Sequence, residues 1–264
     1  MRIQDGARPW TWVVVLLTGL GLFELVRRVL LATGNPNLVP SLILLGAVVG
    51  PAAFVAFVWG RPGSFAVDPV LVVLVACVGG VVGVVTAGLL DYDVLRELGP
   101  LRVAGVGVIE ESAKLLGPAV VLLYAHDRRT AAGLLLGVAS GAGYAALEST
   151  GYALVAFLGA PGDVAAVDQT LLVRGVLSPV THMAWTGLAA AALWTAVRRR
   201  GNPRVMGRFA GVFLGVVAMH TAWDTLATTV AHVVLAVVSL GALGVAVHRL
   251  PRGRRPYRSR VRAG

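Results

Sequence analysis

The sequence contains very little lysine and cysteine, and each scarcity narrows the class of protein. Of its 23 basic residues only Lys114 is a lysine, and the rest are arginines that stand mostly at the ends of apolar runs. A net charge of +10 with that distribution indicates helices oriented in a membrane rather than binding to nucleic acid. The one cysteine, Cys77, excludes an intrachain disulfide. The motifs H-E-x-x-H and G-x-S-x-G are also absent, so neither a zincin nor that kind of serine hydrolase is indicated.

Apolar residues are abundant instead: 57% of the chain is hydrophobic, and its mean hydropathy is +0.80. That excess is too large for a soluble core. A membrane-spanning helix needs roughly 20 mostly apolar residues, and the chain contains run after run of that length. We therefore predict an all-α, polytopic bundle of about eight transmembrane helices, with a kink at Pro179. The expected spans are Trp10–Leu31, Leu38–Trp59, Val67–Leu90, Leu101–Ala125, Thr130–Leu158, Thr170–Val197, Arg204–Leu226 and Thr229–Val247.

Charge predicts which side of the membrane each connecting segment occupies. Arginines gather in alternate segments and in the tail, whereas the intervening segments carry Asp91, Asp163 and Asp168. The positive-inside rule then puts both termini in the cytoplasm, with the chain in the cell membrane. Because no small-x-small cleavage site follows the first apolar run, we expect an uncleaved first helix. Arg27 and Arg28 violate the charge rule and are expected to snorkel to the interface.

Residues 1–248 are expected to form one transmembrane domain, with its motifs in 101–226. Residues 249–264 are expected to form a basic cytoplasmic tail on anionic lipid.

Charged residues in the middle of the fourth span are the strongest functional signal. Glu110, Glu111 and Lys114 together cost about 7–10 kcal/mol on an insertion scale, so other helices or water must meet them. Glu110 and Lys114 lie four residues apart and share a helix face, which also allows a purely structural ion pair. Glu111 points about 100° away and is expected to lack a local partner.

Each of the next three spans also carries polar groups. Glu148 and Tyr152 share a face of the fifth, the sixth contains His182, and His220 and Asp224 share a face of the seventh. At 1.5 Å per residue, Glu110, Glu148, His182 and His220 fall between about 9 and 16 Å from the predicted outer end of their spans. Alone, each has an ordinary reading as a helix-to-helix hydrogen bond. Because such polar groups occur in four consecutive spans and at similar depth, they predict a common buried site.

The sixth span also contains Arg174 near its outer end. Its guanidinium has two readings: it snorkels to the interface, or it holds a carboxylate or a substrate carbonyl.

Such a cluster suits more than one chemistry. A buried carboxylate beside histidines can activate water as a general base, and polarising donors can stabilise an oxyanion. The same atoms can also ligate zinc, which takes imidazole and carboxylate ligands.

The motifs, taken in order, resemble those of the PrsW intramembrane proteases. That family belongs to a wider group that includes the CAAX prenyl proteases and bacteriocin self-immunity proteins. The resemblance covers about half of the chain, and its E-E-x-x-K element is the most specific part. It rests on Glu110-Glu111-x-x-Lys114, Glu148-x-x-x-Tyr152, His182 and His220-x-x-x-Asp224.

The resemblance implies an intramembrane endopeptidase that cuts a membrane-spanning protein, and we expect the cut near the extracytoplasmic side. A known role in the family is the first cut of an anti-sigma factor, so a single-pass protein of that kind is the candidate substrate. By resemblance, the catalytic residues are Glu110, Glu111, His182 and His220. The supporting residues are Lys114, Glu148, Tyr152 and Asp224.

The motifs leave the cofactor open. Water activated by glutamate and histidine without a cofactor is expected, whereas a divalent metal such as zinc would be held by His182, His220 and Glu148. Two rival functions use the same residues: a proton-coupled transporter, and a membrane scaffold without peptidase activity. A prenyl-peptide protease is a further variant within the enzyme class.

Overall fold

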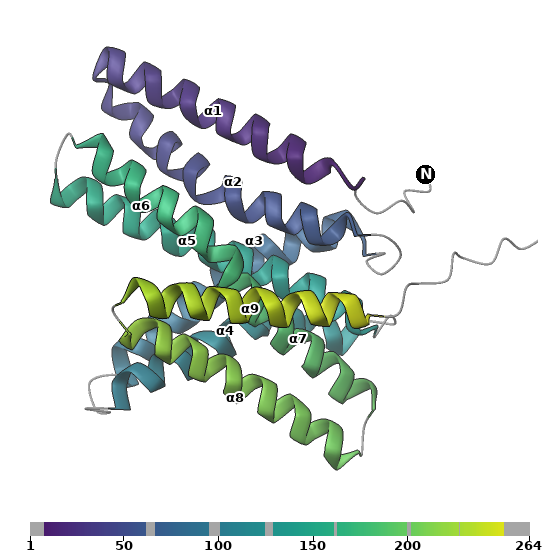
Figure 1. Cartoon of the computed structure of the whole chain (residues 1–264). Coiled ribbons are helices and arrows are strands. Elements are labelled where there is room, and N and C mark those ends of the chain that lie inside the picture. The colour runs from purple at the N-terminus through teal and green to yellow at the C-terminus, as the bar shows by residue number, and fades with distance from the viewer. Residues whose placement is uncertain are drawn as a thin grey trace, which may run out of the picture.

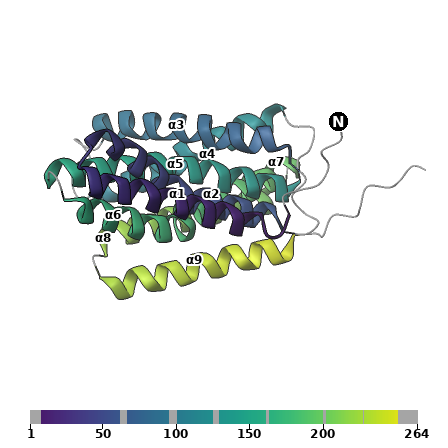
Figure 2. The ribbon, with the colours of Figure 1, turned by 90° about the horizontal axis from the view of Figure 1, so that it is seen from above.

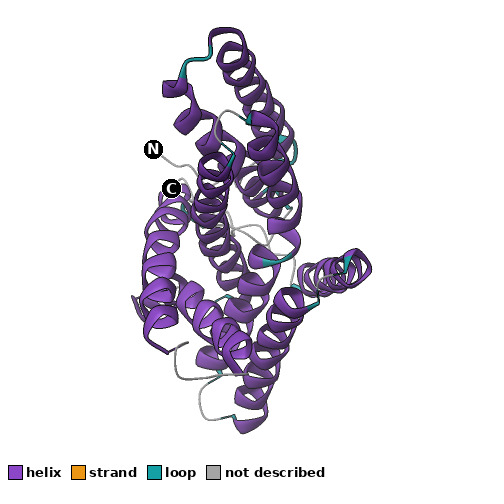
Figure 3. Cartoon of the chain, turned by 90° about the vertical axis from the view of Figure 1, so that its left-hand side faces the viewer, coloured by secondary structure: helices purple, strands orange, loops and turns teal. Residues whose placement is uncertain are grey.

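The computed structural model describes residues 8–61, 67–94, 101–124, 129–160, 163–199, 202–226 and 228–250. In these ranges the chain consists of helices and short connections, without a strand (Figures 1 and 3). The polytopic helical bundle predicted from the sequence is confirmed. Its α-helices are α1 Thr11–Thr33, α2 Val39–Trp59, α3 Pro69–Val94, α4 Arg102–Tyr124, α5 Thr130–Gly159, α6 Val164–Leu177, α7 His182–Arg198, α8 Pro203–Thr225 and α9 Thr229–Arg249.

Six segments of the described chain are long and apolar enough to cross a membrane. They are α2, α3, α5, the continuous α6 to α7 segment, α8 and α9. The other two helices are less apolar because each carries three charged residues in its central part, Glu24, Arg27 and Arg28 in α1 and Glu110, Glu111 and Lys114 in α4. These charges are paired, which lowers their cost in a bilayer. α1 and α4 run alongside the other helices (Figure 2).

The first helix is tied to the bundle by an ion pair. Nε of Arg27 lies 2.6 Å from Oδ2 of Asp168 in α6, and Nε of Arg28 lies 2.7 Å from Oε1 of Glu24. The expected snorkelling of the two arginines stays a prediction, and Arg27 has in addition a charged partner on α6. Apolar residues of α1, α2 and α6 pack beside this pair.

The predicted sixth span is two helices rather than one. α6 begins at Val164, six residues before the predicted start, and a 3-10 turn over Ser178–Val180 separates it from α7. Pro179 causes the break, because it lacks the N–H that would bond to the carbonyl four residues earlier. After the break, the hydroxyl of Thr181 donates to the carbonyl oxygen of Leu177. The break makes His182 the first residue of α7.

Successive segments run in opposite directions, so their ends gather at two sides (Figure 1). One side receives the ends of α1, α5 and α8, together with Asp163 and Asp168. The other side receives Arg61, Arg129, Arg198, Arg204 and Arg249, which stand at or beside helix ends. Residues 251–264, most of the predicted basic tail, lie outside the described residues.

α5 forms the centre of the bundle, with α3 and α9 on opposite faces of the molecule (Figure 2). A stripe of glycines on α5 receives α7. A Cβ on Gly137 would lie 2.5 Å from the carbonyl oxygen of Thr186, and one on Gly141 would lie 2.6 Å from that of His182. Because only glycine leaves that space, small residues let the two backbones approach, as is common in membrane helix pairs. This contact fixes where α7 presents His182.

Candidate active site

Lys114 lies at the centre of the buried polar cluster. Its side chain is fully buried, and Nζ lies 2.8 Å from Oε1 of Glu111, 3.2 Å from Oε2 of Glu110 and 2.9 Å from Nδ1 of His182. The ammonium also stands 4.4 Å from the centre of the Tyr144 ring. The expectation that Glu111 has no local partner is therefore wrong. Residues three apart on a helix are neighbours as well as residues four apart, so one long lysine side chain meets both glutamates.

His182 is held between a cation and an anion. An ammonium only donates hydrogen bonds, so Nδ1 of His182 accepts from Lys114, and the ring proton is on Nε2. That nitrogen lies 3.1 Å from Oε2 of Glu148. His182 is therefore a neutral imidazole that presents an N–H toward α5.

Glu148 joins His182 to α6. Its Oε2 also lies 2.6 Å from Nη2 of Arg174, whose Nε donates to the hydroxyl of Ser149 at 2.9 Å. Of the two readings of Arg174, the structure favours the one in which its guanidinium holds a carboxylate. The guanidinium also stacks 4.2 Å above the ring of Tyr152, which is more than half exposed. Tyr152 therefore contacts Arg174, which in turn pairs with Glu148.

His220 occupies the other end of the cluster. Its Nδ1 lies 2.7 Å from Oε1 of Glu111, which fixes the proton of the neutral ring on Nδ1. Nε2 then faces two carboxylates, Asp224 at 3.3 Å and Glu110 at 3.7 Å. Only 4% of the His220 side chain is exposed, whereas Asp224 is 36% exposed. A nitrogen facing two carboxylates needs a proton, a water or a cation between them.

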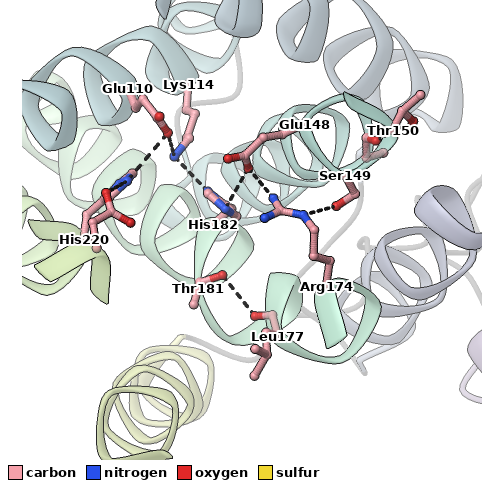
Figure 4. Close-up of polar contacts among 12 residues, drawn as sticks. Glu110, Lys114, Glu148, Ser149, Thr150, Arg174, Leu177, Thr181, His182 and His220 are labelled. Carbon is pink, nitrogen blue, oxygen red and sulfur yellow. Dashed lines mark hydrogen bonds and ion pairs between the residues drawn. The ribbon is translucent and has the colours of Figure 1, made fainter. Parts of the chain in front are cut away.

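These contacts join α4, α5, α7 and α8, the four helices that carry the sequence motifs. Through Arg174 they also include α6 (Figure 4). We call the connected set the polar row. Its members, in order of contact, are His220, Glu111, Lys114, His182, Glu148 and Arg174, with Glu110 beside Lys114 and His220. The structure thus brings together all the residues predicted as catalytic and supporting, Tyr152 and Asp224 at the margins.

Two aromatic residues that the sequence reasoning missed pack against the row. Tyr144 is buried 5.7 Å from the His182 ring, and Trp185 is buried 5.4 Å from the His220 ring. Trp185 also donates from Nε1 to the hydroxyl of Ser239 on α9. Their spacing was a usable signal, because Tyr144 precedes Glu148 by four residues and Trp185 follows His182 by three.

A divalent metal can be tested against the donors present. In the described ranges, no three His, Cys, Asp or Glu side chains stand arranged to hold a metal ion. Yet Oε2 of Glu110 is buried, and it faces Nε2 of His220 at 3.7 Å as well as Nζ of Lys114 at 3.2 Å. Imidazole and carboxylate donors suit zinc, and ligands of one tetrahedral zinc stand about 3.3 Å apart. The residue types therefore fit a metal best at His220, Asp224 and Glu110.

The set expected from the sequence, His182, His220 and Glu148, stays a prediction. All three belong to the polar row, but both ring nitrogens of His182 already contact Lys114 and Glu148.

A bundle of apolar helices around a buried carboxylate and histidine cluster defines a polytopic membrane protein with a buried polar site. Residues 67–248 match the family described as PrsW family intramembrane metalloprotease. That match covers more than half of the chain, from just before α3 nearly to the end of α9, so the chain belongs to this family of intramembrane proteases. It matches no curated protein and no solved structure.

Proposed function

We propose that the chain hydrolyses a peptide bond of a single-pass membrane protein, near the extracytoplasmic side, with water activated at Glu110 and His220. The observation that carries this is the carboxylate–imidazole pair of Glu111 and His220, 2.7 Å apart, which aims Nε2 toward Glu110. An imidazole oriented by one buried carboxylate and facing a second, more accessible group is the arrangement that general-base chemistry uses.

The two glutamates have different roles in this proposal. Glu111 is completely buried and contacts both Lys114 and His220, so it orients the imidazole and balances the lysine charge. Glu110 is 13% exposed, and its Oε2 lies 3.2 Å from Nζ of Lys114 and 3.7 Å from Nε2 of His220. Glu110 is therefore the carboxylate that receives the proton of the attacking water. The water oxygen bonds to the carbonyl carbon, the C–N bond breaks, and the proton passes to the departing amine.

His182 lines the same site, with its ring 6.0 Å from that of His220 at 83°. Its Nε2–H contacts Glu148 at 3.1 Å. To stabilise the oxyanion formed when water attacks, this N–H would exchange its contact with Glu148 for one with the oxyanion. Lys114 already uses its donors on Glu110, Glu111 and His182, and acts as the fixed positive charge of the site.

The family description implies a metal, and His220, Asp224 and Glu110 are the residues that would hold it. A divalent metal bound there would supply Lewis-acid polarisation of the water and of the carbonyl. The roles of the chain's own residues remain as above: Glu111 orients His220, and Lys114 and Arg174 balance the buried carboxylates.

The depth of the site supports an extracytoplasmic cut. Glu110 is eight residues from the start of α4, and His220 is five from the end of α8, about 12 Å and 8 Å along their helices. The start of α4 and the end of α8 both lie on the side opposite the arginine-rich helix ends. The positive-inside rule assigns that opposite side to the exterior. This supports cytoplasmic termini and a cut at or just within the extracytoplasmic end of the substrate helix. Residues 1–248 then act as the protease domain, and 249–264 as a basic tail on lipid.

An anti-sigma factor is the candidate substrate, on the strength of the family resemblance alone. The test is a comparison of membrane proteomes from cells that carry the wild-type protein or Glu110→Gln. The proposal expects a single-pass protein to appear as a trimmed product only with the wild type. Proton flux through reconstituted liposomes without any such product would favour the transporter instead. Full function with Glu110→Gln would favour the scaffold.

A further inference from the structure

Seven buried side-chain polar atoms in the described part of the chain have no hydrogen-bond partner, and four of these are oxygens on three neighbouring helices. One of the four, Oε2 of Glu110, has ion-pair contacts only, 3.2 Å from Nζ of Lys114 and 3.7 Å from Nε2 of His220. Such atoms are rare in folded proteins, and a group of them calls for water or an ion. The four belong to α3, α4 and α8. They are Oδ1 of Asp91, Oε2 of Glu110, Oε2 of Glu111 and Oγ1 of Thr221.

Asp91 belongs to this group because α3 continues beyond its predicted end. The sequence assigned Asp91 to a connecting segment, but it lies within the last turn of α3, Pro69–Val94. Ala87, one turn earlier on the same face, packs with Ala113 and Tyr144. Asp91 therefore faces α4, and the charged groups on that side include Glu110 and Lys114 of α4 and His220 of α8.

Thr221 completes the group from α8. A Cβ on Gly107 would lie 3.0 Å from Oγ1 of Thr221, and Gly107 precedes Glu110 by three residues on the same helix. Thr221 also directly follows His220. These oxygens thus belong to the region where the end of α3 packs against α4 and where α4 packs against α8.

Hydrolysis consumes one water for each bond cut, and a site among apolar helices must be supplied with it. A buried water needs two to four polar partners, and carboxylate and hydroxyl oxygens supply acceptors at the required place. Asp91 stands within the last turn of a membrane-spanning helix, so it lies between the aqueous side and Glu110.

We propose that Asp91 is a positioning residue for hydrolysis, which holds the reacting water against Glu110 at the inner end of a water path bounded by α3, α4 and α8. The role of Asp91 in holding the reacting water rests on the proposed function. The water path does not rest on it, because the access of water to Asp91 and Thr221 can be measured without a known substrate.

Thiol labelling tests the path without any substrate. In a Cys77→Ala background, Asp91→Cys and Thr221→Cys are exposed to a charged, membrane-impermeant methanethiosulfonate in sealed vesicles of both orientations. Both should react at least about tenfold faster than Leu89→Cys, because the charged reagent needs water to reach the thiol. Leu89 is a matched control on the same turn of α3 with a 64% exposed side chain that would face lipid. Equal protection of Asp91→Cys and Leu89→Cys would overturn the path.

Kinetics test the positioning role on a cleaved substrate. Asp91→Asn keeps the shape but loses the charge, and it should lower kcat about tenfold to a hundredfold with KM and Tm unchanged. Asp91→Glu should recover part of kcat. An unchanged kcat in Asp91→Asn would refute the role, as would a loss that follows Tm alone. If no substrate is cleaved at all, the labelling result still decides the path, so the two proposals fail separately.

Discussion

Oε1 of Glu111 lies 2.7 Å from Nδ1 of His220, although 109 residues separate them in the chain. The same oxygen lies 2.8 Å from the ammonium of Lys114. One fully buried carboxylate therefore both orients the imidazole and neutralises the only lysine. This shared use distinguishes Glu111 from its neighbour Glu110.

The two glutamates should respond differently to the same substitution. Glu110→Gln should lower kcat about 10²- to 10⁴-fold with a smaller fall in Tm than Glu111→Gln, because Lys114 keeps its closer partner Glu111. Glu111→Gln should lower both kcat and Tm, because it leaves Lys114 with less counter-charge in the bundle. Enzyme assays and thermal unfolding in detergent measure both. An identical Tm for the two variants would contradict the division of roles.

Lys114 should be required for stability. Lys114→Met leaves Glu110 and Glu111 without their cation, and breaking a buried pair costs about 3–5 kcal/mol. Unfolding in denaturant should show a loss of that order. Arg28→Met is a suitable control, because its side chain is 76% exposed and its pair with Glu24 should contribute little. Similar losses from the two variants would show that Lys114 is not the central charge.

Glu148 and Arg174 should be energetically coupled. Each single change, Glu148→Gln or Arg174→Met, leaves the other charge partly unpaired, so the double variant should lose less than the sum of the two. A coupling free energy of about 0.5–3 kcal/mol is expected from a double-mutant cycle. Strict additivity would mean that the 2.6 Å contact contributes nothing.

The sequence predicted the bundle and the membership of the site because their causes are local. Apolar runs of spanning length define the helices, and charges in mid-helix stand out by their cost. Glu111 was wrongly expected to lack a local partner because Lys114, three residues on, was assigned to Glu110 alone. Contacts between helices are not local, so the partners of Glu111 on α8 and of Arg27 on α6 could not be predicted. The end of α3 was misjudged because Asp91 has the polarity of a loop residue. The groups around Asp91 belong to α4 and α8, and the sequence pattern of α3 gives no information about them.

The glycine stripe of α5 was readable in the sequence as Gly133-x-x-x-Gly137-x-x-x-Gly141, but its consequence for His182 required the structure. Gly141→Ala should destabilise the protein by about 1–3 kcal/mol and reduce activity, because its Cβ would meet the carbonyl oxygen of His182. Gly151→Ala is the matched control on the same helix, since no atom lies within 4 Å of its Cβ. Equal behaviour of the two variants would refute the role of this contact.

Metal content can be measured directly by elemental analysis of the purified protein. If the family's metal is held at His220, wild-type protein should contain it stoichiometrically and His220→Ala should lose it together with activity. His232→Ala should keep it, because that ring stacks on Trp223 and contacts a carbonyl oxygen. Full activity in protein shown to be free of metal would assign the activation of water to Glu110 and His220 alone.

The position of the cut tests the central claim most directly. A single-pass substrate identified from the membrane proteome is incubated with wild-type protein or with Glu110→Gln, and the product ends are read by mass spectrometry. The account predicts new ends at or just within the extracytoplasmic end of the substrate helix, with wild-type protein only. Ends on the cytoplasmic side, or the same ends with Glu110→Gln, would contradict it.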